Sequence, residues 1–159
     1  MKRDKKFSFL NSDVSTISWV TAYDYPIAYC AEMAGIDMLL VGDSAAMVQH
    51  GHESTLPITM LSMITMCQSV RRGASSTFIV GDMPFGSYEA SDEQAVKHAV
   101  DFLKAGNCDA VKLEGGIRIS SRIRAIAQAG ITVIGHIGLT PQSSIQLGGY
   151  KVQGKTLNN

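Results

Sequence analysis

Three acidic residues, Asp43, Asp82 and Glu114, stand at the ends of three consecutive short apolar stretches of the chain. Apolar runs without polar alternation are typical of strands covered on both faces, as in a parallel α/β sheet. Because the carboxyl ends of parallel strands meet at one edge of the sheet, the three carboxylates are expected to converge. Like charges that converge need a cation, and hard oxygen ligands without a neighbouring cysteine suit Mg²⁺. The matched positions favour a magnesium site over three unrelated turn acids.

Three further side chains fall within the same pattern. Lys112 lies two residues before Glu114, so on a strand both side chains point to the same face, where the lysine could meet an anionic substrate such as a carboxylate. Ser44 follows Asp43 directly and brings a hydroxyl group to the same edge. His136 ends the last apolar stretch and is a further candidate for the site, although a single strand histidine is more often a packed, hydrogen-bonded residue.

The elements that must position these residues alternate between strand and helix patterns. Apolar and β-branched runs predict strands over residues 17–23, 38–43, 77–82, 110–114 and 131–137. Helices are expected over residues 24–35, 59–72, 91–104 and 118–130, each with a glycine at or just beyond its end. This alternation predicts a parallel sheet with right-handed crossovers. An open doubly wound sheet and part of a (β/α)8 barrel both satisfy the pattern.

Local signals mark several helix ends. Asp24 is expected to cap the first helix, and Ser91 with Gln94 has the form of a capping box at the start of the third. Arg71 and Arg72 suit the last turn of the second helix, where cations interact favourably with the helix dipole.

The composition is that of a soluble globular protein with one domain, which we place at residues 15–159 after a polar segment at residues 1–14. The chain has 159 residues, of which 45% are hydrophobic and 18% are charged. Fourteen basic residues balance fourteen acidic ones, so no charge pattern indicates a nucleic-acid or membrane partner. No stretch approaches the length of a membrane span, and a cytoplasmic location is expected.

The cysteine and histidine residues outside the strand ends show no metal-binding spacing. The chain has three cysteines that lie far apart and form no CxxC pair: Cys30, Cys67 and Cys108. We expect small buried thiols in a reducing, intracellular compartment. His50 and His52 share a loop with Glu53, where solvated side chains are a better interpretation than metal ligands.

Several motifs between about residues 15 and 155 resemble those of one known family. The matching stretches are 21–25, 41–44, 51–59, 82–88, 111–116, 135–143 and 148–155. They are similar to the N-terminal part of the ketopantoate hydroxymethyltransferases (3-methyl-2-oxobutanoate hydroxymethyltransferases).

The resemblance implies a (β/α)8 barrel that needs Mg²⁺ and assembles into a homo-oligomer. The family transfers a hydroxymethyl group from 5,10-methylenetetrahydrofolate to 3-methyl-2-oxobutanoate, giving 2-dehydropantoate for pantothenate biosynthesis. By position, the acids that match the family's metal site are Asp43, Asp82 and Glu114. The residues that match its 2-oxo acid site are Asp43, Ser44, Asp82 and Lys112.

The chain departs from the family pattern in two places. Ala45 and Ala46 stand where the family usually has a larger residue and a glycine. The family's catalytic glutamate lies on a later strand, so no catalytic base is assigned here. We therefore expect a barrel truncated after about five βα units. Expressed alone, it would be aggregated, poorly folded or rescued only by association through its open strand edges, and it would lack transfer activity. One alternative is a non-catalytic remnant that acts as an assembly module. The other is a phosphoenolpyruvate/pyruvate-type magnesium barrel enzyme, which ranks lower because enzymes of that type would lack the motifs that this chain has at residues 135–143 and 148–155.

Overall fold

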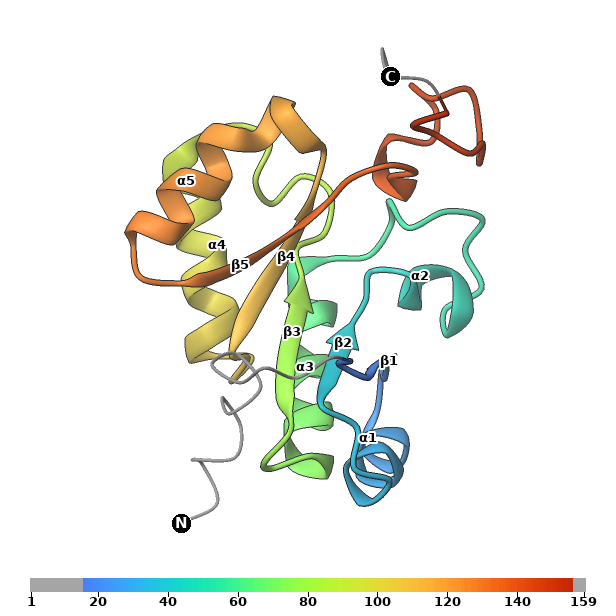
Figure 1. The fold of residues 1–159 in the computed structure, drawn as a ribbon, viewed down its shortest axis with the longest axis vertical. Coiled ribbons are helices and arrows are strands. Elements are labelled where there is room, and N and C mark those ends of the chain that lie inside the picture. Colours follow the sequence, from blue (N-terminus) through green and yellow to red (C-terminus); the bar gives the residue numbers. More distant parts are fainter. Residues whose placement is uncertain (1–15, 156–159) are drawn as a thin grey trace.

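The computed structural model describes residues 16–155, so the polar segment at residues 1–14 lies outside the described part of the chain. The described strands form one parallel sheet of five strands in the order β1-β2-β3-β4-β5 (Figure 1). Their bounds are β1 (Trp19–Thr21), β2 (Met38–Val41), β3 (Phe78–Asp82), β4 (Ala110–Glu114) and β5 (Thr132–His136). All five predicted strands are confirmed, with ends that differ by at most two residues from the prediction.

Helices alternate with these strands, as predicted. Their bounds are α1 (Tyr25–Met33), α2 (Ala45–Val48), α3 (Met60–Gly73), α4 (Asp92–Lys104) and α5 (Ser120–Gln128). Two 3-10 turns, η2 (Gly116–Ile119) and η3 (Pro141–Ser143), follow β4 and β5. The sequence pattern did not predict α2, which is only one turn long and begins at the buried pair Ala45 and Ala46.

The predicted caps form at the starts of α1 and α4. The Asp24 carboxylate accepts a hydrogen bond from the Ile27 N–H at 3.0 Å. The Ser91 hydroxyl accepts one from the Gln94 N–H, also at 3.0 Å. The Gln94 side chain, however, accepts from the N–H of Ala90 at 3.2 Å. The capping box therefore closes one residue earlier than its motif predicts.

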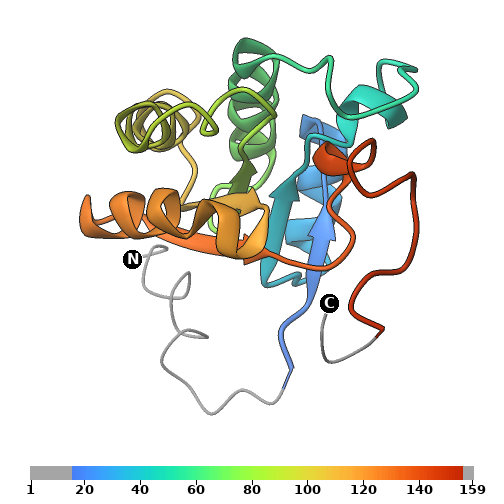
Figure 2. The same ribbon diagram turned by 90° about the horizontal axis from the view of Figure 1, so that it is seen from above.

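The arrangement of the helices decides between the two predicted architectures. Strand order follows chain order, α1 packs against α3, α3 against α4, and α4 against α5 (Figures 1 and 2). One hydrophobic core joins residues of all four of these helices to alternate residues of the strands. A doubly wound sheet would reverse its strand order and place helices on both faces. The sequential order with helices on one face is that of a (β/α)8 barrel.

The opposite face of the sheet carries a second, smaller core of Met38, Phe78, Val80 and Ala110. Side chains two residues apart on a strand point to the same face. Lys112 follows Ala110 by two residues, so it lies on this inner face. On the inner face of the sheet, this apolar cluster therefore lies next to the polar residues of the carboxyl edge, on the side toward the amino ends of the strands.

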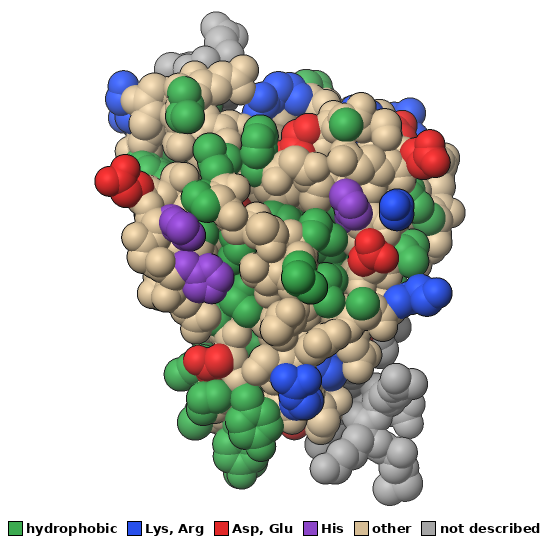
Figure 3. Space-filling view, turned by 180° about the vertical axis from the view of Figure 1, so that it is seen from behind, with side chains coloured by type: hydrophobic (Ala, Val, Ile, Leu, Met, Phe, Trp, Pro, Cys, Tyr) green, Lys and Arg blue, Asp and Glu red, His purple; other side chains and the backbone are tan. Residues whose placement is uncertain are grey.

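The outer surface of α1 is apolar and exposed. Hydrophobic side chains gather over this helix at the lower end of the face in Figure 3, and those of Tyr25, Ile27, Tyr29 and Met33 are exposed. Cys30 is exposed as well, whereas Cys67 and Cys108 are buried. The expectation of three buried thiols is therefore wrong for Cys30, because α1 packs inward through Ala28 and Ala31. No helix within residues 16–155 is long and apolar enough to cross a membrane.

Candidate active site

The centre of the candidate site is an ion pair between Asp82 and Lys112. These residues are register partners on β3 and β4, and Lys112 Nζ lies 2.6 Å from Asp82 Oδ1. The Asp82 side chain is only 3% exposed. Burial raises the pKa of Asp82 to about 7, the nearby Asp43 adds to the rise, and Lys112 opposes it. The ion pair with Lys112 therefore lowers the pKa of Asp82 by less than burial raises it.

Asp43 and Ser44 reach the same place from the end of β2. The Asp43 N–H points to Asp82 Oδ2 at 3.3 Å, and the Asp43 side chain is buried. The Ser44 hydroxyl lies 2.8 Å from the Tyr23 hydroxyl. A Cβ atom on Gly42 would come within 2.9 Å of Ser44 Oγ. Gly42 therefore gives the serine side chain the room it needs to turn back toward Tyr23.

Glu114 and His136 are register partners on β4 and β5. Glu114 Oε1 accepts the Gln142 N–H at 2.9 Å. Burial raises the pKa of Glu114 and lowers the pKa of His136, and Lys112 lowers the latter further. Both shifts favour the neutral forms, so the 3.0 Å contact of Glu114 Oε2 with His136 Nδ1 is not a strong ion pair. The two atoms are also not aligned for a hydrogen bond, and neither has another hydrogen-bond partner among the described residues.

Two buried residues that the sequence interpretation missed connect these groups. Gln142 Nε2 donates to Asp43 Oδ2 at 2.9 Å, and Gln142 Oε1 accepts from the Tyr88 hydroxyl at 2.5 Å. The Tyr88 hydroxyl also lies 3.0 Å from the Glu114 carbonyl oxygen. Both residues stand in motifs beyond strand ends, and that position was a signal for their role. The pattern of acidic and basic residues at the strand ends does not include them.

The donor atoms fit a divalent cation, although not through three direct carboxylate ligands. The buried carboxyl groups of Asp43, Asp82 and Glu114 face one partly buried ammonium group, that of Lys112, and Glu114 Oε2 has lone pairs that no described residue uses. Within residues 16–155, no three His, Cys, Asp or Glu side chains are placed so that they could hold one metal ion. Mg²⁺ needs only one or two carboxylates and completes its shell with water and substrate oxygens. Asp43 and Asp82 are the neighbouring pair that fits this requirement.

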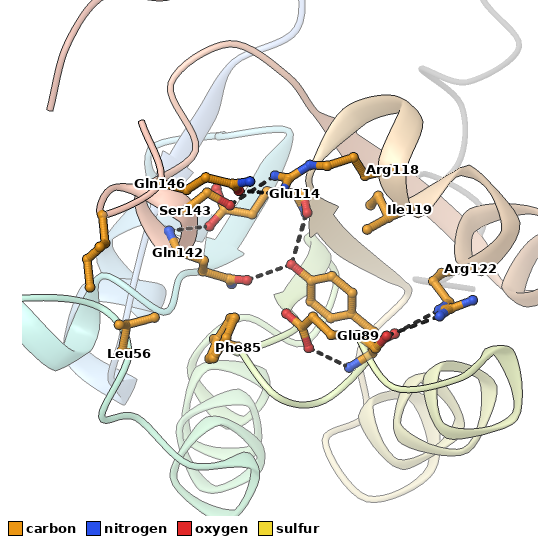
Figure 4. Close-up of a pocket in the computed structure, with 12 residues that line it drawn as sticks. Leu56, Phe85, Glu89, Glu114, Arg118, Ile119, Arg122, Gln142, Ser143 and Gln146 are labelled. Carbon is orange, nitrogen blue, oxygen red and sulfur yellow. Dashed lines mark hydrogen bonds between the residues drawn. The ribbon is translucent and has the colours of Figure 1, made fainter. Parts of the chain in front are cut away.

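A pocket of about 620 Å³ opens beside these residues (Figure 4). Glu114 and Gln142 lie at one side of it, and Arg118 reaches across to Ser143 and Gln146. Its apolar lining residues are Leu56, Phe85, Ile119 and Ile145. The pocket therefore places apolar surface and a guanidinium group next to the carboxylate cluster.

The loop histidines stand apart from the site. His50, His52 and Glu53 are exposed, and the two imidazole rings meet edge to face with their centroids 6.2 Å apart. These contacts agree with the interpretation of solvated loop residues.

Comparison with known proteins decides the family. The sequence profile described as "Ketopantoate hydroxymethyltransferase" matches residues 4–159 of this chain. The chain belongs to the ketopantoate hydroxymethyltransferase family.

Named relatives agree with this assignment. The 3-methyl-2-oxobutanoate hydroxymethyltransferase of Alkaliphilus metalliredigens is 60% identical over 143 residues, which cover 90% of this chain and 51% of the relative. The mitochondrial 3-methyl-2-oxobutanoate hydroxymethyltransferase 2 of Oryza sativa subsp. japonica is 59% identical over 145 residues, which cover 90% of this chain and 36% of the relative. The chain thus spans about half, or less, of the length of these members of the ketopantoate hydroxymethyltransferase family.

Solved structures confirm the predicted fold class. The phosphoenolpyruvate phosphomutase of Streptomyces platensis subsp. rosaceus superposes with a TM-score of 0.69 at 15% identity, covering 84% of this chain and 52% of that one. A 2,3-dimethylmalate lyase of the PEP mutase/isocitrate lyase superfamily gives 0.63 at 21% identity, covering 84% of this chain and 51% of the lyase. The described part of this ketopantoate hydroxymethyltransferase family member has the fold of the corresponding half of these barrels.

Proposed function

We propose that this chain supplies the metal-binding and 2-oxo acid-binding residues of an enzyme that transfers a hydroxymethyl group from 5,10-methylenetetrahydrofolate to 3-methyl-2-oxobutanoate. The product is 2-dehydropantoate, an intermediate of pantothenate biosynthesis. The observation that carries the proposal is the buried cluster of Asp43, Asp82 and Lys112 at the carboxyl edge of the sheet, in a chain 60% identical to a named hydroxymethyltransferase.

In this proposal Asp43 and Asp82 hold Mg²⁺, and Glu114 takes part through Oε2, which no described residue engages by a hydrogen bond. When bound, the cation acts as a Lewis acid that polarises the keto group and makes C3 of the substrate more acidic. The phosphonopyruvate hydrolase that superposes with a TM-score of 0.69 at 14% identity was solved with oxalate and Mg²⁺, so a protein of this fold binds both a divalent cation and a small dicarboxylate, which supports the proposal.

The remaining residues orient the 2-oxo acid. Lys112 adds positive charge on the inner face of the sheet. This charge attracts the carboxylate of the substrate and so orients the substrate in the site. The Tyr23 and Ser44 hydroxyls use one proton between them, so the second proton can be donated to a substrate oxygen. The lowered pKa of His136 keeps its imidazole neutral near pH 7, and His136 stays a candidate for proton transfer. We assign the catalytic base to none of the described residues.

The pocket beside Glu114 is where we propose that the folate co-substrate binds, because it joins apolar surface to the carboxylate cluster. A phosphoenolpyruvate/pyruvate-type reaction is less well supported. The barrels of that type reported above are only 14–21% identical to this chain, against 60% for the hydroxymethyltransferase.

Titration calorimetry on the purified protein tests the proposal. Asp82→Ala should weaken Mg²⁺ binding by about 10-fold or more, whereas the exposed Glu53→Ala should leave it unchanged. Lys112→Ala should weaken binding of 3-methyl-2-oxobutanoate while Mg²⁺ affinity stays close to that of the wild type. Equal effects of Asp82→Ala and Glu53→Ala would contradict the metal assignment. A folded protein that binds neither ligand would instead support the assembly-module alternative.

We also propose a homo-oligomeric enzyme located in the cytoplasm. The expectation comes from the family resemblance, and the exposed apolar surface of α1 is consistent with contacts between subunits. Light scattering on the purified protein, together with cell fractionation, measures both properties. A monodisperse monomer at micromolar concentration would contradict the oligomer.

A further inference from the structure

The geometry points to Gln142 as a positioning residue that holds Asp43 and Glu114 ready for a divalent cation, with Tyr88 acting through it. This inference rests on the proposed function, because it concerns the same metal site.

Gln142 contacts both carboxylates at once. Its side-chain Nε2 donates to Asp43 Oδ2, and its main-chain N–H donates to Glu114 Oε1, each at 2.9 Å. The first contact joins residues 99 positions apart in the chain. One oxygen of each carboxylate is thereby held by Gln142. The second oxygen of Glu114, Oε2, lies 3.0 Å from His136 Nδ1 but makes no hydrogen bond to a described residue.

The start of η3 makes the main-chain contact available. Pro141 begins this 3-10 turn, and Gln142 is the next residue. The first N–H groups of a helical turn have no acceptor within it. The Gln142 N–H is one of these groups, and Glu114 supplies its acceptor.

The orientation of the Gln142 amide follows from its surroundings. Nε2 faces Asp43 Oδ2 and the Met83 carbonyl oxygen, each at 2.9 Å, and an ionised carboxylate and a carbonyl can only accept. A reversed amide would place its oxygen against two acceptors. Oε1 must therefore face Tyr88, whose hydroxyl lies 2.5 Å away.

Tyr88 completes the arrangement by donating its single hydroxyl proton. Gln142 Oε1 is closer to the hydroxyl, at 2.5 Å, than the Glu114 carbonyl oxygen at 3.0 Å. Tyr88 is 1% exposed and Gln142 is 7% exposed, so water does not compete for these bonds. Burial raises the pKa of Tyr88, which keeps the hydroxyl protonated and able to donate. The Tyr88 hydroxyl therefore holds the Gln142 amide in the orientation in which Nε2 donates to Asp43.

Groups that orient metal ligands from behind typically change metal affinity or activity by about 10- to 100-fold when they are replaced. A residue that only packs would change the stability of the protein and leave the metal affinity of the folded molecules unchanged. Metal affinity is therefore the measurement that separates positioning from packing.

The experiment measures the Kd for Mg²⁺ by titration calorimetry for the wild type, Gln142→Leu, Tyr88→Phe and the double variant, after circular dichroism shows that each is folded. Gln142→Leu should raise Kd by about 10- to 100-fold. Tyr88→Phe removes only the hydroxyl, so it tests the same contact with little change in volume, and it should raise Kd by a smaller factor. If Tyr88 acts through Gln142, the double variant should bind no more weakly than Gln142→Leu alone.

Gln68→Leu is the matched control. The Gln68 amide also donates to a carbonyl oxygen at 2.9 Å, that of Ala105, but it is exposed and belongs to α3. Its replacement should leave Kd unchanged. Unchanged Kd in both Gln142→Leu and Tyr88→Phe, with Mg²⁺ binding in the wild type, would overturn this inference alone. Additive effects in the double variant would overturn the role of Tyr88. A wild-type protein that binds no Mg²⁺ would overturn the proposed function and this inference together.

Discussion

The buried Asp82 carboxyl group makes the stability of the protein depend on pH in an unusual direction. Burial raises its pKa to about 7, although Lys112 lies 2.6 Å away. In an unfolded chain the pKa of aspartate is about 3.9. Between these two values the folded protein binds more protons than the unfolded chain. The contribution of Asp82 to the free energy of unfolding is therefore greatest below about pH 4, falls as pH rises toward 7, and is constant above that.

We predict that Asp82→Asn removes this dependence in protein freed of Mg²⁺. The free energy of unfolding of the wild type, minus that of the variant, should fall by roughly 4 kcal/mol between pH 4 and pH 8. Urea denaturation at a series of pH values measures it. Asp37→Asn is a control of opposite sign, because hydrogen bonds from Ser18 lower the pKa of Asp37 and its contribution is lost as pH falls. Parallel pH curves for the wild type and Asp82→Asn would contradict the shift.

At the scale of elements, Arg71 ties the end of α3 to two neighbouring connections. The sequence predicted only a favourable position near the helix dipole, and Arg71 does lie in the last turn. Its guanidinium group also donates to the carbonyl oxygens of Asn107, Ala74 and Thr77 at 2.9–3.1 Å. It lies 2.6 Å from Asp109 Oδ2, and the Arg71 side chain is only 10% exposed. One side chain therefore joins α3 to the segments that lead into β3 and β4.

Arg71→Ala should lower the free energy of unfolding by on the order of 3 kcal/mol, because it removes the cation from a largely buried pair and leaves three carbonyl groups without this donor. Arg72→Ala, at the exposed neighbouring position, should change it by less than about 0.5 kcal/mol. Denaturant unfolding of the two variants at equal pH gives the comparison. Similar losses would mean that the dipole interaction, which both arginines share, accounts for the effect.

At the scale of the whole molecule, the candidate site joins distant parts of the chain. Its residues come from the ends of β2, β3, β4 and β5 and from η3. A ligand at this site contacts several elements that are close together only in the folded protein, so it binds the folded state and not the unfolded chain. Its binding free energy therefore adds to the stability of the sheet as a whole.

We predict that Mg²⁺ at 100 times its Kd raises the free energy of unfolding of the wild type by about 2.7 kcal/mol. The same concentration should have little effect on the Asp43→Asn, Asp82→Asn double variant. Thermal and urea unfolding with Mg²⁺ or with a chelator measure the difference. Equal stabilisation of both proteins would place the bound metal elsewhere.

The sequence by itself determined the order and type of the main elements and the edge at which chemistry gathers. Apolar runs, glycine helix ends and caps such as Asp24 are local signals, since each depends on residues a few positions apart. The position of an acidic residue at the end of the second, third and fourth strands was predictable for the same reason, because each acid directly follows or ends a short apolar run. The pattern missed α2, because a single turn at Ala45–Val48 has too few residues to show a helical period.

Only the tertiary structure decided which of these groups meet. Strand register places Asp82 opposite Lys112 and Glu114 opposite His136, and register depends on the packing of whole strands. The alternation of strands and helices left two architectures open, the family resemblance predicted the barrel, and the observed strand order confirmed it. Gln142 is an uncharged residue in η3, in a motif that follows β5, but its local sequence does not show that it contacts Asp43, 99 positions away. Such a contact exists only once the strands have brought their carboxyl ends together, so it could not be predicted from local sequence.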